Sequence, residues 1–438
     1  MDLEDIARQL YRNGSTTEDM VKRLMKLTGS QEMSKAILKE IIATEDIQDE
    51  LVSNIAHFPV SAVEAKEASV GCRGEGDFFV HHLIADVIGE TGAEVDSKQQ
   101  DDGGVVKLPS GSDQHLVIAV DGMHSRLSHF PFLGGFHAAR ASLRDVVVMG
   151  ARPLAMLSDV HIGNNGDVGK ILDYTAGINT VGKALGIPLV SGSTLRIGGD
   201  MVTGERITGC VGAVGLASVI KPRKHASPGH DILLTKGSGG GTISTTALFN
   251  GYHSVVKRTL NLGFLKATIP FLDHPLMKDI KCFTDVTNGG IRGDACEISR
   301  TAQVRINLDM EQFLRTIDKE VLNMLDDLDI DPLGVSTDSL LIICPSEDTV
   351  DILDYFSEQG QAPEKIGTVE KGNCVYLNTG KGQEKIVPKF REAPYTPIKK
   401  VVGTKTPMNW KELQDKLSKA ANASKEKQEK MLEWLEEQ

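Results

Sequence analysis

Long apolar segments are missing from this chain of 438 residues. No uninterrupted apolar run approaches the roughly 20 residues that a membrane-spanning helix needs, so we expect no membrane association. The first ten residues, MDLEDIARQL, are acidic and amphipathic and do not resemble a secretory signal. Together these absences predict a cytoplasmic protein.

Metal-binding and disulfide spacings are also missing. The six cysteines are scattered without a Cys-x-x-Cys pair, and the histidines show no His-x-x-x-His or His-Glu-x-x-His spacing. Neither a disulfide framework nor a zinc site is therefore expected, and reduced thiols fit a cytoplasmic setting. Cys72 lies in a glycine loop and is either a nucleophile or a small packed residue, of which we favour the second. His124 is the one histidine that we would test.

Excess positive charge is absent as well. The net charge of −12 disfavours a general role in binding nucleic acid. With 40% hydrophobic and 25% charged residues, the composition is that of an ordinary globular protein. The length predicts two or three domains, at about 150 residues each.

Strand-like and helix-like runs alternate in both halves of the chain. This order predicts the α+β class, with two domains built on mixed sheets and helical appendages at both ends. Within the second domain, the pattern at 311–325 predicts one continuous helix. The expected segments are a helical N-terminal appendage at 1–60, a first domain at 65–220, a linker at 221–230, a second domain at 228–390 and a helical tail at 400–438.

Several carboxylates follow predicted strands or interrupt apolar segments. Asp101 and Asp102 precede two glycines, a pattern that by itself also makes a good turn. Asp121 follows the apolar strand at 115–120, and Asp145 lies in an otherwise apolar helix, where an unpaired charge would be costly. Carboxylates at strand ends suit Mg²⁺, which takes oxygen ligands and commonly bridges to phosphate.

Two glycine loops precede predicted helices. GCRGEGDFFV (71–80) contains Arg73, and LLTKGSGGGTIS (233–244) follows a strand and contains Lys236. Bare backbone near a helix N-terminus offers N–H donors to phosphate. Neither loop is a Walker A motif or a convincing dinucleotide fingerprint, and each alone is also compatible with a plain turn.

A third polar junction lies in FTDVTNGGIRGDACEIS (283–299), which begins like a strand and ends like a helix. Asp285, Asn288, Gly289 and Gly290 present polar groups and little side-chain bulk at the point of transition. We interpret this junction as part of a ligand site. The alternative is an N-capped helix preceded by a tight turn.

The ordered set of these motifs resembles the AIR synthase (PurM)-like superfamily over roughly residues 65–380, and looks most similar to the AIR-synthase-related proteins of methanogenic archaea. The resemblance implies the two-domain PurM-like architecture, with first domains that pair in a homodimer. It also implies that ATP and Mg²⁺ bind near that interface, together with a small-molecule substrate.

The resemblance assigns roles to the motif residues of this chain. It implies a metal site formed by Asp101, Asp102 and Asp121. We expect Asp285, Asn288 and Lys236 to be catalytic. The expected nucleotide-binding residues are Gly71, Arg73, Gly74, Gly76, Asp121, Asp145, Gly239, Gly240, Gly289 and Gly290.

The chain departs from the superfamily pattern at several positions. Ser193 replaces an acid or histidine, and Arg144 replaces an asparagine. The Gly-Cys-Gly-Cys-Lys loop of selenophosphate synthase is missing, and the C-terminal sequence MLEWLEEQ lacks the acceptor cysteine of the hydrogenase-maturation proteins. We therefore do not expect either of those two activities.

Two hypotheses of function follow. The first is an ATP- and Mg²⁺-dependent enzyme, of the ligase, cyclo-ligase or phosphotransferase kind, that activates a substrate heteroatom such as an amide-type oxygen. The second is a nucleotide-binding maturation or regulatory factor without turnover, which Ser193 and the helical appendages favour.

Overall fold

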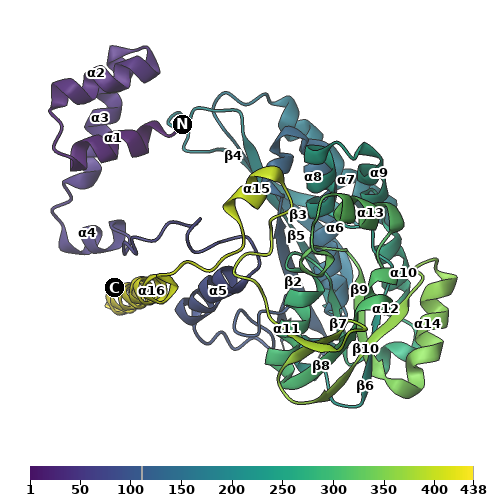
Figure 1. Cartoon of the computed structure of the whole chain (residues 1–438). Coiled ribbons are helices and arrows are strands. Elements are labelled where there is room, and N and C mark those ends of the chain that lie inside the picture. The colour runs from purple at the N-terminus through teal and green to yellow at the C-terminus, as the bar shows by residue number, and fades with distance from the viewer. Residues whose placement is uncertain (110–111, 438) are drawn as a thin grey trace.

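The computed structural model describes residues 1–109 and 112–437, and its strands form two separate sheets (Figure 1). Residues 110–111 and 438, which fall within the predicted first domain and tail, lie outside the described residues. The sheets are mixed, and helical segments precede the first and follow the second. The predicted α+β class is confirmed.

The first sheet has five strands in the order β1-β2-β5-β3-β4. Only β3 and β4 pair in parallel. The strands are β1 (Gly104–Lys107), β2 (His115–Gly122), β3 (Arg152–Ile162), β4 (Leu189–Arg196) and β5 (Ile207–Ala217).

Helix α6 (Pro131–Val148) lies between the two sheets, because it packs on β2 and β5 of the first sheet and also contacts β7 of the second. Its residues are apolar or small on almost every side, so it is buried along most of its length. Helix α7 (Gly169–Leu185) packs on α6, where Gly135 and Gly177 allow the two backbones to approach closely. One continuous apolar core joins the two domains around α6.

The other face of the first sheet carries exposed apolar side chains. They are Ile118 and Val120 of β2, Leu157 of β3, and Val190 and Leu195 of β4. Val190 is 65% exposed, although alternation along a strand normally directs such residues to a core. This open sheet face is therefore an unpaired apolar surface in a single protomer.

The second sheet has seven strands in the order β12-β11-β8-β10-β6-β9-β7. Only β8 and β11 pair in parallel. The strands are β6 (His230–Leu234), β7 (Cys282–Asp285), β8 (Val304–Asp309), β9 (Leu340–Pro345), β10 (Glu364–Lys371), β11 (Val375–Asn378) and β12 (Gln383–Ile386). Its helices are α8 (Gly241–Asn250), α9 (His253–Thr259), α10 (Gly263–Phe271), α11 (Gly290–Ala302), α12 (Met310–Arg315), α13 (Lys319–Asp327) and α14 (Thr349–Glu358).

The prediction of one helix at 311–325 is wrong, because α12 ends at Arg315 and α13 begins at Lys319. Ile317 forms a β-bridge with Gly237, which pulls the intervening backbone out of the helical path. The Asp318 side chain then accepts a hydrogen bond from the backbone N–H of Glu320 and caps the second helix.

The N-terminal residues form α1 (Leu3–Arg12), α2 (Thr17–Thr28), α3 (Gln31–Glu45) and α4 (Glu50–Ala56). The first three share a small core, and the backbone N–H of Leu3 donates to the carbonyl of Met201 in the main body. Helix α5 (Glu75–Ile88) packs against the C-terminal α16 (Trp410–Glu436), which follows the short α15 (Pro397–Val402) (Figure 1). No helix in the described ranges combines the length and apolar character that crossing a bilayer requires.

Candidate active site

A cavity of about 650 Å³ lies between the two domains. Its wall is formed by the loop before α5, the end of β2, the buried helix α6, the start of α8 and the junction between β7 and α11. The predicted site residues that line it are Gly71, Arg73, Asp101, Asp102, Asp121, Asp145, Gly240, Asp285 and Asn288. Segments separated by more than 200 residues in the sequence thus meet in one cavity.

Gly74, the N-cap residue of α5, and Gly76, in its first turn, do not line this cavity. A Cβ atom on Gly74 would lie 2.5 Å from the carbonyl oxygen of Phe390, and one on Gly76 would lie 2.5 Å from the carbonyl oxygen of Ala68. The Glu75 backbone N–H donates to the carbonyl of Lys389 at 2.9 Å. Close packing against Ala68 and the C-terminal segment around Phe390 therefore explains why glycine stands at positions 74 and 76.

Lys236 and Gly239, from the second glycine loop, also lie outside the cavity wall. The Lys236 side chain is exposed, whereas the carbonyl of Gly239 accepts a hydrogen bond from Arg140 at 3.2 Å. Gly239 has φ +79°, which favours glycine, and a Cβ there would clash with Ile243. From this loop, only Gly240 and the two residues that follow it reach the cavity.

Gly289 and Gly290 form part of the turn between β7 and α11, where both have positive φ angles. Gly290 has φ +61°, and a Cβ atom there would lie 2.6 Å from the backbone nitrogen of Val335. Gly289 has φ +97° and is the N-cap residue of α11, which has no side-chain cap. Among the described residues no side chain caps α11, so neither Asp285 nor Asn288 is its cap, whereas the tight turn of the alternative interpretation is present and explains the two glycines.

Asp285 and Asn288 instead bind side chains from other parts of the chain. Asp285 is buried, and Arg144 of α6 donates to its Oδ2 at 2.9 Å. The other carboxylate oxygen, Oδ1, is buried without a hydrogen-bond partner among the described residues. The Thr242 hydroxyl of α8 donates to Oδ1 of Asn288 at 2.7 Å. The junction therefore joins both domains at the cavity.

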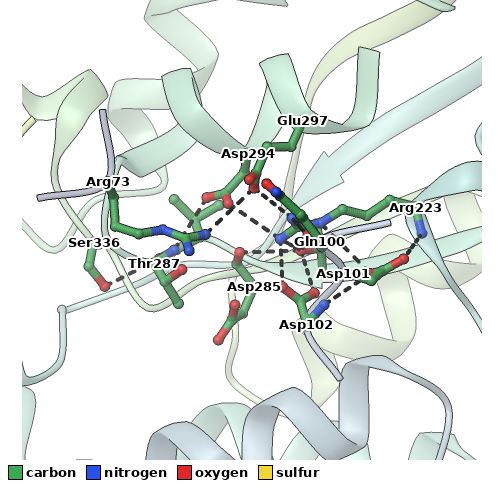
Figure 2. A network of polar contacts seen from close by, with 12 residues as sticks. Arg73, Gln100, Asp101, Asp102, Arg223, Asp285, Thr287, Asp294, Glu297 and Ser336 are labelled. Carbon is green, nitrogen blue, oxygen red and sulfur yellow. Dashed lines mark hydrogen bonds and ion pairs between the residues drawn. The ribbon is translucent and has the colours of Figure 1, made fainter. Parts of the chain in front are cut away.

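Arg223 binds four carboxylates from both domains. Figure 2 shows its side chain extending between them, and its guanidinium lies 2.5 Å from Asp102 and 2.6 Å from Glu297. Its backbone N–H donates to Asp101 at 2.9 Å, and Asp294 lies 3.5 Å from the guanidinium. The side chain of Arg223 is only 1% exposed, so this is a buried ionic network.

The segment at 221–230 is therefore more than a linker. The sequence pattern predicted a linker here, yet Arg223 is among the largest fully buried side chains of the described residues. The guanidinium of Arg223 can stay charged although it is buried, because carboxylates lie on two sides of it. The sequence offered little indication that Arg223 would be buried, since a basic residue near a proline is typical of exposed loops.

Two arginines of α6 form a second buried ionic group. Arg140 and Arg144 both form ion pairs with Asp338, which precedes β9. Arg140 also donates to the carbonyl of Asn261 at 2.9 Å. The departure at Arg144 from the superfamily pattern thus has a structural explanation, because this residue pairs with Asp285 and Asp338.

Asp77 organises the loop before α5. Its two carboxylate oxygens accept hydrogen bonds from the backbone N–H groups of Gly71 and Arg73, each at 2.8 Å. Arg73 adopts φ +49°, and its guanidinium lies 3.6 Å from Glu297. The loop is therefore held rigidly, with Gly71 and Arg73 at the cavity wall.

Four carboxylates that line the cavity lie near one another, and we call them the acidic wall: Asp102, Asp121, Asp145 and Asp285. Within the described ranges, no side chain donates a hydrogen bond to Asp121 or Asp145, and no cation lies within 4.0 Å of either. Burial raises the pKa of Asp121, and burial together with the charges of Asp285, Asp121 and Asp102 raises that of Asp145 well above its usual range. The acidic wall therefore carries more carboxylates than there are nearby protein cations to balance them.

The two predicted metal ligands that precede β1 are already engaged by the protein. Arg223 pairs with Asp101 and Asp102, and the hydroxyl of Thr284 donates to Asp102 at 2.7 Å. Burial nevertheless raises the pKa of Asp101 to about 7 and that of Asp102 to about 6. In the part of the chain that the structure describes, no three His, Cys, Asp or Glu side chains are grouped closely enough to hold a metal ion.

Several residues of the cavity escaped the sequence analysis. Nothing in the sequence around Arg140 and Asp77 distinguishes them from other polar residues of helices. Asp338 resembled a turn residue before a strand. Tyr395 and Lys399 lie beyond the segment that carried the resemblance, although both line the cavity. The Ser191–Thr194 segment, which departs from the superfamily pattern, lies on edge strand β4 and outside the cavity wall.

Comparison with known proteins places both domains in one family. Residues 100–217 match the family described as AIR synthase related protein, N-terminal domain, and residues 227–378 match its C-terminal domain. An uncharacterized protein of Methanocaldococcus jannaschii is 45% identical over 100% of this chain and 99% of its own length. The selenide, water dikinase of Myxococcus xanthus is 30% identical over 48% of this chain and 58% of its own length.

Solved structures share the fold at low sequence identity. The hydrogenase maturation protein HypE in complex with ATP is 18% identical, with a TM-score of 0.56 over 72% of this chain and 93% of its own. The protein AaThiL, complexed with AMPPCP and TMP, is 19% identical, with a TM-score of 0.52 over 69% of this chain and 93% of its own. The two family matches together cover more than half of the sequence. The chain therefore belongs to the AIR synthase related family and has its two-domain, PurM-like fold.

Proposed function

We propose that this protein is an ATP- and Mg²⁺-dependent enzyme that uses the cavity between its domains to phosphorylate or otherwise activate a small-molecule substrate. The observation that carries the proposal is the acidic wall, whose carboxylates face the cavity without enough positive charge around them. A related solved structure, HypE, is described in complex with ATP, and another, AaThiL, with the analogue AMPPCP.

The residues fit a divalent cation by charge and by donor type. Within the described ranges, no cation lies within 4.0 Å of Asp121 or Asp145, and Oδ1 of Asp285 is buried without a hydrogen-bond partner. Carboxylate oxygens are the donors that Mg²⁺ prefers. We therefore propose that the ion binds among Asp121, Asp145 and Asp285, with Asp102 adjacent, and that nucleotide phosphate oxygens complete its coordination, because no three of the described side chains are grouped closely enough to hold it alone. When bound, Mg²⁺ would neutralise phosphate charge and orient the phosphoryl group.

The start of α8 is the proposed phosphate contact of the second domain. Gly240, Gly241 and Thr242 line the cavity there, and a helix N-terminus presents backbone N–H groups to anions. A Cβ atom on Gly241 would lie 3.5 Å from the Cβ of His124 and 3.6 Å from that of His137, so the backbone passes close to the first domain. In the first domain, Gly71 and Arg73 supply the corresponding contact.

Nucleotide binding tests the proposal directly. We expect ATP to bind in calorimetry when Mg²⁺ is present and to bind at least about tenfold more weakly in excess EDTA. ADP formation with a phosphorylated product would separate the enzyme from the alternative, a nucleotide-binding factor without turnover. Equal ATP affinity with and without Mg²⁺ would contradict the metal assignment.

The stabilisation by Mg-ATP should increase with pH. Because the pKa of Asp101 is raised to about 7 and that of Asp102 to about 6, the folded state binds more protons than the unfolded state from about pH 4 to pH 7. Asp101 and Asp102 therefore stabilise the unliganded fold less as the pH rises through that range. Asp102 belongs to the acidic wall, and burial also raises the pKa values of Asp121, Asp145 and Asp285, so a cation must compete with protons for all four carboxylates. We expect the Mg-ATP-induced rise in Tm to be larger at pH 7.5 than at pH 5.5.

Comparing Tm with and without Mg-ATP at each pH serves as the internal control. Burial lowers the pKa of His124 to about 4 and that of His137 to about 3, so their effect on stability runs in the opposite direction with pH. The effect of the two histidines on Tm is present with and without Mg-ATP, so it cancels when the two Tm values are subtracted. A shift in Tm that is the same at both pH values would count against competition between protons and the cation at the acidic wall.

We further propose that the open sheet face pairs two protomers. Ile118, Leu157, Val190 and Leu195 form an apolar surface, and face-to-face packing of two sheets buries such residues about 10 Å apart. A two-fold axis would bring the same face of each protomer together. This arrangement places the interface on the side of the first sheet opposite α6.

Light scattering at micromolar concentration should give a dimer mass for the wild-type protein and a monomer mass for Leu157→Asp. The substitution would bury a charge in the apolar interface, which is costly unless the charge is paired. Val350→Asp is the matched control, because Val350 is 64% exposed on α14 of the second domain. A monomer mass for the wild-type protein would reject the proposed homodimer.

A further inference from the structure

The C-terminal segment completes the cavity from outside the family domains. Tyr395 and Lys399 line the cavity, whereas the match to the C-terminal family domain ends at residue 378. Tyr395 is 2% exposed and belongs to the apolar core of the second domain. The segment is fixed on both sides of these residues, because Phe390 packs against Trp410. Its presence at the cavity is therefore part of the folded structure.

A chain of hydrogen bonds holds Lys399 in place. The Lys399 ammonium donates to the Tyr395 hydroxyl at 3.0 Å, and this hydroxyl lies 2.9 Å from Nε2 of His124. Nδ1 of His124 lies 3.0 Å from the hydroxyl of Thr245. Burial and the charges of Lys399 and Arg126 lower the pKa of His124 to about 4, so the imidazole is neutral at pH 7. Nε2 can then accept from Tyr395 while Nδ1–H donates to Thr245.

Lys399 differs from the other cations of the cavity because it has no carboxylate partner. Arg73, Arg140, Arg144 and Arg223 each form an ion pair. Within the described ranges, no carboxylate lies within 4.0 Å of the Lys399 ammonium. Burial together with the charges of Arg391 and Arg126 lowers the pKa of Lys399.

The surroundings of Lys399 thus concentrate positive charge without an anion to balance it. Arg126 stacks over the ring of Phe249, with its guanidinium carbon 4.0 Å from the ring centroid. Within the described ranges it forms no ion pair with a carboxylate either. A half-buried lysine held in this field is stabilised by any anionic group that enters the cavity beside it.

We propose that Lys399, positioned by Tyr395 and His124, binds an anionic group, a carboxylate or a phosphate monoester, of the second substrate. This assignment rests on the proposed function, because it assumes that a second substrate shares the cavity with Mg-ATP. The proposal assigns two binding functions to different residues of one cavity. The acidic wall holds the cation with the nucleotide, and Lys399 recognises the acceptor. Since Lys399 lies outside the family domains, it would distinguish this chain from relatives that act on other substrates.

The test uses the full-length protein saturated with Mg²⁺ and AMPPCP, so that nucleotide phosphates occupy their own site. Inorganic phosphate and acetate are titrated separately, and binding is followed by their protection of Lys399 against acylation, mapped by peptide mass spectrometry. We expect at least one anion to slow acylation of Lys399 several-fold while leaving the neighbouring Lys400 unaffected. The more effective anion identifies the substrate group as phosphate or carboxylate.

The variants Lys399→Gln and Lys400→Gln provide the matched pair. Because one charged hydrogen bond is lost, Lys399→Gln should weaken calorimetric binding of the effective anion by about tenfold or more, with Mg-AMPPCP affinity unchanged within about twofold. Lys400→Gln should change neither affinity. An equal loss of Mg-AMPPCP affinity in Lys399→Gln would assign Lys399 to the nucleotide and overturn the proposal, as would an absence of protection by both anions.

Failure of the proposed function gives a different pattern. If AMPPCP does not bind the wild-type protein, the same titrations are made without nucleotide. Protection of Lys399 in the wild-type protein, together with calorimetric anion affinity that falls about tenfold or more in Lys399→Gln, would then still support the anion site, whereas unchanged anion affinity in that variant would overturn it.

Discussion

The double variant Asp121→Asn, Asp145→Asn should lose Mg-ATP binding by about 100-fold or more, while its thermal unfolding midpoint stays the same or rises. The two effects have opposite signs because these carboxylates repel one another in the unliganded protein and are useful only to a cation. Removing the two charges relieves that repulsion, and the amides occupy nearly the same volume.

Calorimetry measures the affinity, and differential scanning calorimetry measures the midpoint without nucleotide. The control variant Asp351→Asn, Asp354→Asn removes the same charge from exposed positions of α14, and it should retain wild-type Mg-ATP affinity. A double variant that binds Mg-ATP normally would remove both residues from the metal site. A large fall in the midpoint would show that their role is structural.

Asp121 and Asp145 are better positions than Asp102 for testing metal binding, because of their contacts. Asp102 corresponds to a metal-binding acid in the superfamily pattern, but it also pairs with Arg223 and accepts a hydrogen bond from Thr284. Its substitution would therefore alter the ionic network that joins the domains as well as any metal site. Asp121 and Asp145 have no such protein partner among the described residues, so changes there report on ligand binding.

Replacing Arg223 by methionine should lower the free energy of unfolding by about 3–5 kcal/mol. The substitution retains much of the side-chain volume but removes the cation between Asp101, Asp102, Asp294 and Glu297. Burial raises the pKa of Asp294 well above its usual range even with Arg223 present. Without the guanidinium, these acids would be buried with much less compensation.

Urea unfolding followed by circular dichroism measures this loss. The control Arg152→Met removes an exposed ion pair with Asp273 and should change stability by about 1 kcal/mol or less. Adding Asp102→Asn to Arg223→Met should restore part of the lost stability, because one of the uncompensated charges is then removed. An effect of Arg223→Met no larger than that of Arg152→Met would mean that the ionic network contributes little to the fold.

The sequence by itself determined the class of fold and the polar junctions of the cavity. Alternation of apolar residues placed most strands and helices, since periodicity is a local property that burial on one face imposes. Asp101, Asp121 and Asp285 were identified because a carboxylate next to an apolar strand interrupts that pattern. The order of the motifs then indicated the family, and the match of residues 100–217 and 227–378 confirms it.

Only the tertiary structure decided which polar residues meet and which glycines line the cavity. Arg223 looked like part of a linker, because nothing near it in sequence shows the four carboxylates that surround it. Gly74 and Gly290 looked like ligand contacts, but each is required by backbone from a segment distant in sequence. Tyr395 and Lys399 reach the cavity from beyond the family domains. Long-range contacts of this kind depend on how the two domains close around α6, and no local pattern of residues encodes that closure.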